Sequence, residues 1–170
     1  MVLCDHEIHS LARRRNLVTP FNPELINPAS LDIRLGDNLL IELPSTPSLV
    51  PYSIAGHTQE KPFMLQPGEF ILSETLEEFQ LPDCIAGQLA LKSSRAREGI
   101  EHLLAGYIDP GYKGRLTLEL QNARAMHPVS LWPGMRIAQI VFHRMSMLPG
   151  KDYSMTGRYY GDTTVQESKG

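Results

Sequence analysis

The segment Ala105-Gly-Tyr-Ile-Asp-Pro-Gly-Tyr-Lys-Gly-Arg-Leu-Thr-Leu-Glu-Leu-Gln-Asn122 predicts a tight hairpin turn that leads into a β-strand. We place the turn at residues 108–111, because proline fixes φ and glycine readily adopts a positive φ. After Gly114 apolar and polar residues alternate, so that three leucines share one face of the strand and Thr117, Glu119 and Gln121 share the other. The segment therefore indicates a half-buried strand with a turn beside it.

Two carboxylates, Asp109 and Glu119, lie on this compact β unit. Glu119 is either a solvent-facing residue of a half-buried strand or a general acid/base whose pKa is raised by burial. Asp109 either stabilises its Asp-Pro-Gly turn or orients a water molecule or a sugar hydroxyl. The pattern alone leaves both alternatives open for each residue.

Composition narrows the class of protein. The chain has 170 residues, 42% of them hydrophobic, which suits one domain with a core. Its formal net charge of −3 disfavours a general nucleic-acid binder, and no apolar run is long enough to span a membrane. The N-terminus lacks a signal peptide's apolar stretch, and two distant cysteines make neither a disulfide framework nor a metal site. We expect a cytoplasmic enzyme or binding protein with no nucleic-acid or membrane partner.

The remaining sequence predicts a mainly β fold. Proline and glycine recur about every ten residues from residue 44 onward, with short apolar or alternating runs between them, which is typical of a barrel or sandwich. The runs cover residues 31–35, 39–43, 70–72, 85–91, 116–120, 129–132 and 137–142. A short helix is expected after Asp5, ending at the basic triplet of residues 13–15. Residues 44–62 are expected to form a long loop, and the last twenty residues a mobile tail without a core role.

The segment Lys92-Ser-Ser-Arg-Ala-Arg97 gathers three cations and two hydroxyls. Arginine offers forked donors, serine adds neutral donors, and a helix beginning after Ser94 would present free N–H groups, all of which suit a phosphate. The alternative is a solvated helix start. The six histidines show no metal-ligand spacing, and there is no P-loop.

Together these segments resemble the dCTP deaminase branch of the trimeric dUTPase superfamily, over nearly the whole chain. Five segments match the family's motifs in order, and they cover residues 26–36, 87–99, 105–122, 131–139 and 157–169. The resemblance implies a dUTPase-like distorted β-barrel or jelly-roll over residues 1–150. It also implies that a flexible tail, residues 151–170, closes over the nucleotide site.

Three residues favour a deaminase within this superfamily. A plain dUTPase has an apolar residue at the position of Glu119, and the deaminases have Glu there; Ser93 and Arg97 also follow the deaminase pattern. Gly106-Tyr107 and Gln139 resemble the bifunctional subtype, which deaminates dCTP and then cleaves dUTP to dUMP and diphosphate.

The resemblance also assigns roles. Glu119 would shuttle the protons of a zinc-independent deamination, while the Ala105 carbonyl and the Ser93 hydroxyl hold the water and Arg97 fixes the geometry. Asp109 would orient the sugar and the water that attacks phosphorus, and Mg²⁺ would be held by the triphosphate rather than by protein side chains. The sites would lie between the subunits of a homotrimer. The nucleotide-binding residues would be Lys92, Ser94, Arg95, Ala96, Thr117, Leu118, Gln139, Tyr153, Arg158 and Asp162.

The tail departs from the family pattern. Arg158 and Asp162 stand where Lys and Gln are usual, and an aspartate near a triphosphate is costly unless a cation intervenes. Two other functions stay open: a dUTP diphosphatase without deaminase activity, and a non-catalytic nucleotide-binding relative.

Overall fold

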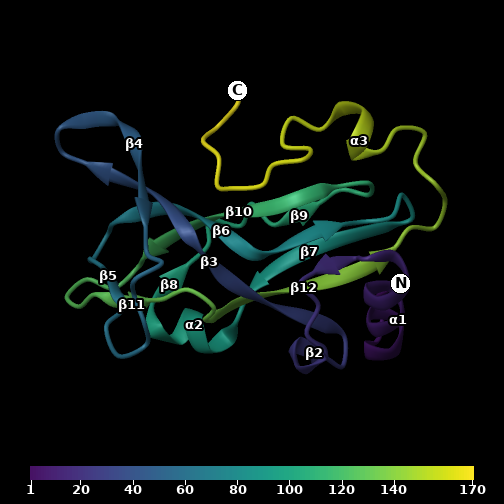
Figure 1. Ribbon diagram of the computed structural model, residues 1–170, viewed down its shortest axis with the longest axis horizontal. Coiled ribbons are helices and arrows are strands. Elements are labelled where there is room, and N and C mark those ends of the chain that lie inside the picture. Colours follow the sequence, from purple (N-terminus) through teal and green to yellow (C-terminus); the bar gives the residue numbers. More distant parts are fainter.

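The computed structural model describes residues 1–170 and is built mainly of β-strands (Figure 1). Its helices are α1 (Asp5–Arg15), α2 (Ser93–Glu98) and α3 (Tyr153–Thr156), with a 3-10 helix η1 (Pro23–Leu25). Its strands are β1 (Val18–Thr19), β2 (Ile26–Asn27), β3 (Ser30–Leu43), β4 (Thr46–Ser53), β5 (Phe63–Leu65), β6 (Phe70–Gln80), β7 (Ile85–Leu91), β8 (Ile100–Glu101), β9 (Tyr107–Ile108), β10 (Lys113–Asn122), β11 (Val129–Leu131) and β12 (Arg136–Arg144).

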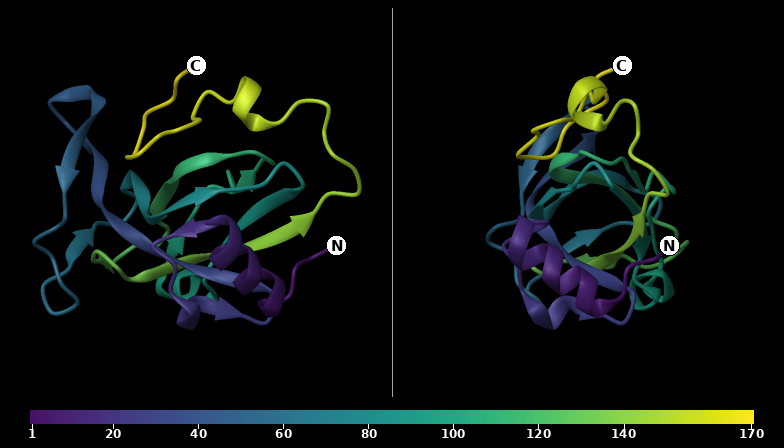
Figure 2. Two further views of the ribbon diagram at one scale, coloured as in Figure 1. Left: turned by 45° about the vertical axis from the view of Figure 1, so that its right-hand side comes forward. Right: turned by 90° about the vertical axis from the view of Figure 1, so that its right-hand side faces the viewer.

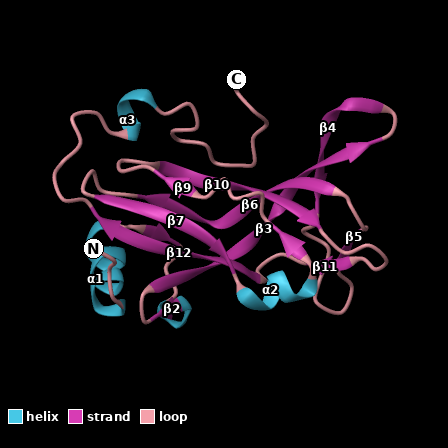
Figure 3. Ribbon diagram, turned by 180° about the vertical axis from the view of Figure 1, so that it is seen from behind, coloured by secondary structure: helices cyan, strands magenta, loops and turns pink.

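One ten-stranded sheet curls into a distorted barrel. Its strands follow the order β8-β10-β6-β3-β12-β7-β9, and β1, β2 and β4 pair off this path. The right-hand view of Figure 2 shows the strands surrounding the interior, and Figure 3 shows how little of the chain is helical. The mainly β fold predicted from the sequence, including both short helices, is therefore confirmed.

The interior of this barrel is a continuous apolar core. Phe79 and Phe142 are its largest fully buried side chains, and Leu118 and Leu120 of β10 face into it. Burial of such side chains is the main favourable contribution to folding, because apolar surface leaves water. The predicted alternation holds for Leu118 and Leu120, which point inward, while Thr117 and Glu119 stay on the partly exposed face. Leu116 departs from it and is only partly buried, because the pairing of β10 to β6 shifts register between Arg115 and Thr117.

The first half of the chain differs from the prediction in two of its strands. The runs at 31–35 and 39–43 belong to one strand, β3, in which the pairing to β6 shifts register between Leu35 and Leu39. The segment expected to be a long loop contains β4, which pairs with the end of β3 in a hairpin that projects from the barrel (Figure 1). Cross-strand pairing outweighs the prolines here, because a strand with an unpaired edge tolerates the missing N–H groups.

The segment at residues 105–122 corrects a third expectation. β9 and β10 do not pair with each other: β9 pairs with β7, and β10 pairs with β6 and β8. The turn also lies one residue later than predicted, since the Tyr112 N–H donates to the Asp109 carbonyl across Pro110-Gly111, and Gly111 has φ of 81°. Glycine favours that positive φ. The segment therefore connects β9, at one end of the curled sheet, to β10, which lies next to the strand at the other end.

The N-terminal helix begins at Asp5, one residue earlier than predicted, and has a different capping residue. Cys4, rather than Asp5, is the N-cap, and its backbone N–H donates to the Glu7 carboxylate. Ile8 and Ala12 are buried, and the basic triplet lies in the last turn, where cations favour the helix dipole.

The C-terminal tail contributes to packing, which corrects the expectation that it has no core role. Val165 is buried beside Leu40 and Leu72 in a small apolar cluster. The tail also pairs with the start of β10, where the Arg115 N–H donates to the Asp162 carbonyl and the Gly161 N–H to the Lys113 carbonyl, both at 2.8 Å. The division of the chain at residue 150 stays a prediction.

Candidate active site

A pocket of about 590 Å³ lies between the outer face of β10, the turn before it and the C-terminal tail. Six of the residues predicted for catalysis or nucleotide binding line this pocket: Ala105, Asp109, Thr117, Glu119, Tyr153 and Asp162. Most of its other walls are apolar or aromatic, from Leu49, Phe70, Leu72, Tyr107, Ile108, Tyr112, Leu116 and Tyr159, and Arg115, Gln166, Glu167 and Ser168 add polar groups. The arrangement suits a flat ring with polar substituents.

Glu119 projects from β10 into this pocket. The strand alternation that buries Leu118 and Leu120 turns Glu119 to the opposite face, where it is half-buried. Burial raises the pKa of Glu119 above its ordinary value, and the residue's own backbone N–H opposes this only in part. No side chain of another residue pairs with the carboxylate. The carboxyl is therefore available to exchange a proton with a ligand, as a general acid/base does.

Ala105 and Asp109 lie at the two ends of β9, at the mouth of the pocket. Both are exposed. The Asp109 carbonyl accepts the Tyr112 N–H in the turn, and Asp109 also lines the pocket. Gly106 lies against β7, whose Leu89 N–H donates to the Gly106 carbonyl at 2.7 Å. A Cβ at Gly106 would lie 2.9 Å from the Leu89 carbonyl oxygen, so this path requires glycine. The segment thus fixes the two predicted residues through its backbone.

Three tyrosines line the side of the pocket nearest the tail. The rings of Tyr112 and Tyr153 lie 5.4 Å apart, and the Tyr153 hydroxyl accepts the Tyr159 N–H. Burial, and then the proximity of Tyr153, raises the pKa of the Tyr112 phenol far above its ordinary value. Tyr112 is therefore neutral over the physiological range and donates its hydroxyl proton to the Arg115 carbonyl.

Thr117 and Leu118 present different groups. The Thr117 hydroxyl lies at the pocket and accepts the Gln166 N–H of the tail at 3.2 Å. The Leu118 side chain is buried in the core, so this residue can meet a ligand only through its backbone, and its carbonyl accepts a hydrogen bond from Ser73.

The tail contains a cation that compensates Asp162. Lys169 donates to both carboxylate oxygens of Asp162, at 2.7 and 2.8 Å, and to the Arg158 carbonyl. Its ammonium also lies 5.1 Å from the centre of the Tyr159 ring, where a cation–π contact is favourable. The Arg158 side chain is exposed and outside the pocket. The unusual aspartate thus forms an ion pair within the tail.

The basic segment on α2 lies elsewhere. None of residues 92–97 lines the pocket, and α2 lies on the opposite side of the barrel from the tail (Figures 1 and 3). Ser93, Ser94, Ala96 and Arg97 are exposed, and α2 begins at Ser93, two residues before the expected start. Arg95 is used within the chain, where it pairs with Glu98 at 2.6 Å and stacks on Trp132.

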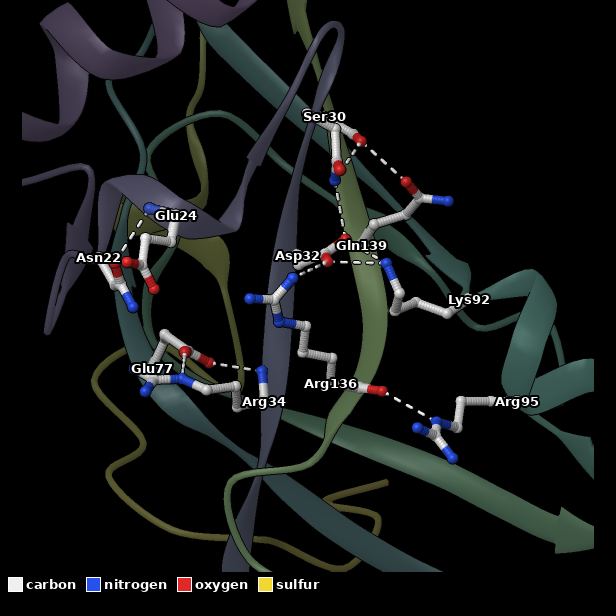
Figure 4. Close-up of polar contacts among 11 residues, drawn as sticks. Asn22, Glu24, Ser30, Asp32, Arg34, Glu77, Lys92, Arg95, Arg136 and Gln139 are labelled. Atoms are coloured by element: carbon white, nitrogen blue, oxygen red, sulfur yellow. Dashed lines mark hydrogen bonds and ion pairs between the residues drawn. The ribbon is translucent and has the colours of Figure 1, made fainter.

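Lys92 and Gln139 belong to a polar cluster beside α2 (Figure 4). The Lys92 ammonium donates to both oxygens of Asp32 at 2.7 Å, and Asp32 itself is only 1% exposed. Gln139 accepts a hydrogen bond from Ser30, on the strand β3 that pairs with β12. A buried carboxylate needs such a partner, because desolvation penalises an unpaired charge. Within one chain the predicted site residues therefore form two separate groups, one at the pocket and one at and beside α2.

Several pocket residues were not predicted from the sequence. Among them are Arg115, Phe70 of β6 and Tyr159 of the tail, and Glu74, which is buried and pairs with Arg115, was not predicted either. Glu74 lies in a strand whose sequence, Phe70–Gln80, has three glutamates and no clear alternation. The three glutamates among the apolar residues of this strand were the one sequence feature that pointed to a buried carboxylate.

Glu119 also gives a stability prediction that is independent of activity. Its pKa is raised from an ordinary value of 4.5, so the folded protein binds this proton more readily than the unfolded chain. The wild type has this stabilisation in full below about pH 4.5 and loses it as pH rises through the raised pKa. We expect Glu119→Gln to gain melting temperature relative to the wild type between pH 4 and pH 8, measured by calorimetry at about one-unit steps. A difference that stays constant with pH would contradict the desolvation of this carboxyl.

Two further findings concern metals and membranes. No three His, Cys, Asp or Glu side chains are grouped closely enough to hold a metal ion. No helix has the length and apolar character required to cross a bilayer.

The comparisons with known proteins agree with this geometry. A family profile described as dCTP deaminase-like matches residues 2–145. A "dCTP deaminase, dUMP-forming" of Methanopyrus kandleri is 40% identical over 185 residues, which cover 99% of this chain and 95% of that protein. A protein of the same name from Corynebacterium efficiens is 37% identical over 183 residues, covering 100% of this chain and 94% of that protein.

A solved structure shares the fold. The 2′-deoxycytidine 5′-triphosphate deaminase from Agrobacterium tumefaciens matches with a TM-score of 0.69 at 22% identity, covering 84% of this chain and 48% of that chain. The dUTPase-like distorted barrel inferred from the sequence is thereby confirmed. With a family profile over most of its length and relatives near 40% identity, this chain belongs to the dCTP deaminase-like family.

Proposed function

We propose that this protein is an enzyme that hydrolytically deaminates dCTP and releases dUMP. The observation that carries the proposal is Glu119, a carboxyl without a side-chain partner and with a raised pKa, which faces a pocket built for a flat ring. Relatives near 40% identity over almost the whole chain have the name "dCTP deaminase, dUMP-forming", which matches this chemistry.

Deamination needs a group that moves protons near C4 of cytosine. The Glu119 carboxylate takes a proton from a water molecule whose oxygen bonds to C4, and delivers that proton to ring nitrogen N3. The hydroxyl proton of the resulting tetrahedral intermediate then passes to the amine, the C4–N bond breaks and ammonia leaves. Water and dCTP are consumed, and dUTP and ammonia are formed. The raised pKa of Glu119 favours this exchange, since burial makes the carboxylate a better proton acceptor than an exposed one.

The remaining catalytic groups come from a second copy of the chain in this proposal. Ser93 and Arg97 are exposed on α2 and outside the pocket of their own chain, while Ala105, Asp109 and Glu119 lie at it. A site shared between subunits unites the two groups, and a homotrimer with three such sites is the assembly we propose. In it, the Ser93 hydroxyl and the Ala105 carbonyl hold the water, and Arg97 fixes their geometry.

The second reaction cleaves dUTP to dUMP and diphosphate. Asp109 orients the water that attacks the α-phosphorus and contacts the sugar, while Lys92, Ser94 and Gln139 contribute phosphate contacts from the neighbouring subunit. We propose that Mg²⁺ would be held by the triphosphate oxygens rather than by protein side chains. Bound in that way, it would supply charge neutralisation for the leaving diphosphate. We place the reaction in the cytoplasm, with the nucleotide pool.

Product analysis tests the proposal. The purified protein is incubated with Mg²⁺ and either dCTP or dUTP, and nucleotides, diphosphate and ammonia are quantified over time. We expect ammonia, dUMP and diphosphate to appear in equal amounts from dCTP. Accumulation of dUTP would restrict the function to deamination, release of dUMP from dUTP alone would leave a diphosphatase, and no change in either nucleotide would refute the enzymatic proposal.

A further inference from the structure

Glu74 is a buried carboxylate that joins three parts of the chain. It lies on β6, its relative exposure is 0%, and its oxygens accept hydrogen bonds from donors on three different segments. The Asn38 amide of β3 donates at 2.8 Å and the Arg115 guanidinium of β10 at 3.0 Å, both to Oε1. The third donor is the backbone N–H of Val165 in the tail, which reaches Oε2 at 3.0 Å.

The surroundings of Glu74 are closely packed against it. A Cβ on Gly36 would lie 2.5 Å from the Glu74 Cγ, so the neighbouring strand needs glycine where the carboxylate's stem passes. On the tail side, Val165 is buried against Leu40 and Leu72, and the next N–H, that of Gln166, donates to Thr117. Both Arg115 and Thr117 line the pocket, so the carboxylate connects the tail directly to the pocket wall.

We propose that Glu74 is a positioning residue that fastens the C-terminal tail over the nucleotide pocket. Its Oε2 fixes the tail at Val165, and this places Tyr159, Asp162 and Gln166 along the pocket. The kinetic part of the proposal rests on the proposed function, whereas the mechanical part concerns the tail alone. Glu74 does not touch the reacting atoms; it acts through the tail.

Glu74→Gln removes the fastening without removing volume. A carboxylate accepts at both oxygens, but an amide presents one acceptor and one donor group. If the amide nitrogen takes the place of Oε2, its N–H groups meet the Val165 N–H, which loses its acceptor. If the nitrogen takes the place of Oε1, its N–H groups meet the donors of Asn38 and Arg115 instead. Either orientation leaves a buried donor without an acceptor, which is unfavourable. Because Asn38 and Arg115 lie on strands of the sheet whereas Val165 lies outside any helix or strand, we expect the tail to detach.

Glu77 provides a matched control on the same strand. It is also buried, at 1% exposure, and also pairs with an arginine, since Arg34 donates to it through Nε at 2.7 Å and through its backbone N–H at 2.9 Å. It makes no contact with the tail. Glu77→Gln therefore reproduces the loss of a buried charge and of an arginine partner, but leaves the Val165 N–H in place.

Hydrogen exchange of the tail amides, measured without nucleotide, tests the mechanical part. We expect exchange in residues 159–168 to accelerate roughly ten-fold or more in Glu74→Gln relative to the wild type, as loss of a charge-assisted hydrogen bond implies. Glu77→Gln should leave exchange of these residues unchanged. Equal protection of the tail in the two variants would overturn the proposal, whether or not the protein turns over dCTP.

A second pair of variants approaches the same bond from the tail, in case Glu74→Gln does not fold. Val165→Pro deletes the N–H that reaches Glu74, whereas Thr163→Pro changes a residue whose N–H has no partner. Only Val165→Pro should accelerate exchange. If dCTP is turned over, Glu74→Gln and Val165→Pro should raise KM roughly ten-fold and change kcat less, because the tail contacts the bound nucleotide. An unchanged KM with a lower kcat would overturn the positioning role.

Discussion

Replacing Glu119 by Gln is expected to abolish measurable ammonia release from dCTP, lowering kcat by roughly 10²–10⁴-fold, the range typical of a general acid/base. Glutamine keeps the size of the side chain but can neither take the proton of water nor deliver it to the ring. The carboxyl is half-buried in the pocket and its raised pKa reflects desolvation rather than a structural ion pair, so the fold does not depend on it. Ammonia is measured by a coupled assay at saturating dCTP.

Glu78→Gln is the control for this variant. Glu78 is a half-buried glutamate on the adjoining strand β6, outside the pocket. Its substitution therefore measures the effect of removing a carboxylate from a strand without altering the pocket. It should leave ammonia release within about two-fold of the wild type, since a surface substitution has small effects. Glu119→Gln with unchanged ammonia release would show that another group moves the proton.

Mixing two inactive variants is expected to restore ammonia release. In the proposed homotrimer, Arg97→Ala and Glu119→Gln would each disable every site when present alone, but in one chain Arg97 lies on α2, away from the pocket that contains Glu119. If each site draws Glu119 from one subunit and Arg97 from another, about one site in four of an equal mixture contains both native residues. The two variants are co-expressed with different tags, purified as mixed assemblies and assayed for ammonia.

Ser93→Ala mixed with Arg97→Ala is the matched control. Both residues lie on α2, so every site that receives α2 from either variant has a defect. This mixture should remain at the level of its parents. Recovery in the control, or none in the first mixture, would contradict a site shared between subunits.

Local sequence patterns predicted the elements whose residues carry a periodic signal. The alternation from Leu116 to Leu120 predicted both the core face of β10 and the placement of Glu119 on the other face, and β7 was predicted with its bounds. The pairing of strands could not be predicted from local patterns. β4 and the long continuous β3 depend on cross-strand hydrogen bonds, which no local pattern encodes. The two sides of the turn at Pro110 were predicted to form one hairpin, although they pair with different strands.

The sequence by itself determined the family, the acidic residue expected to act on the base and the order of the motifs, because these depend on residue types at fixed spacings. The tertiary structure alone decided which groups meet. It placed Glu119, Asp109 and the tail at one pocket and α2 on the other side of the barrel, and it buried Glu74 beneath the tail at Val165. The physical reason is that such contacts arise from the closure of the curled sheet and from the pairing of buried charges, both of which join residues far apart in the chain.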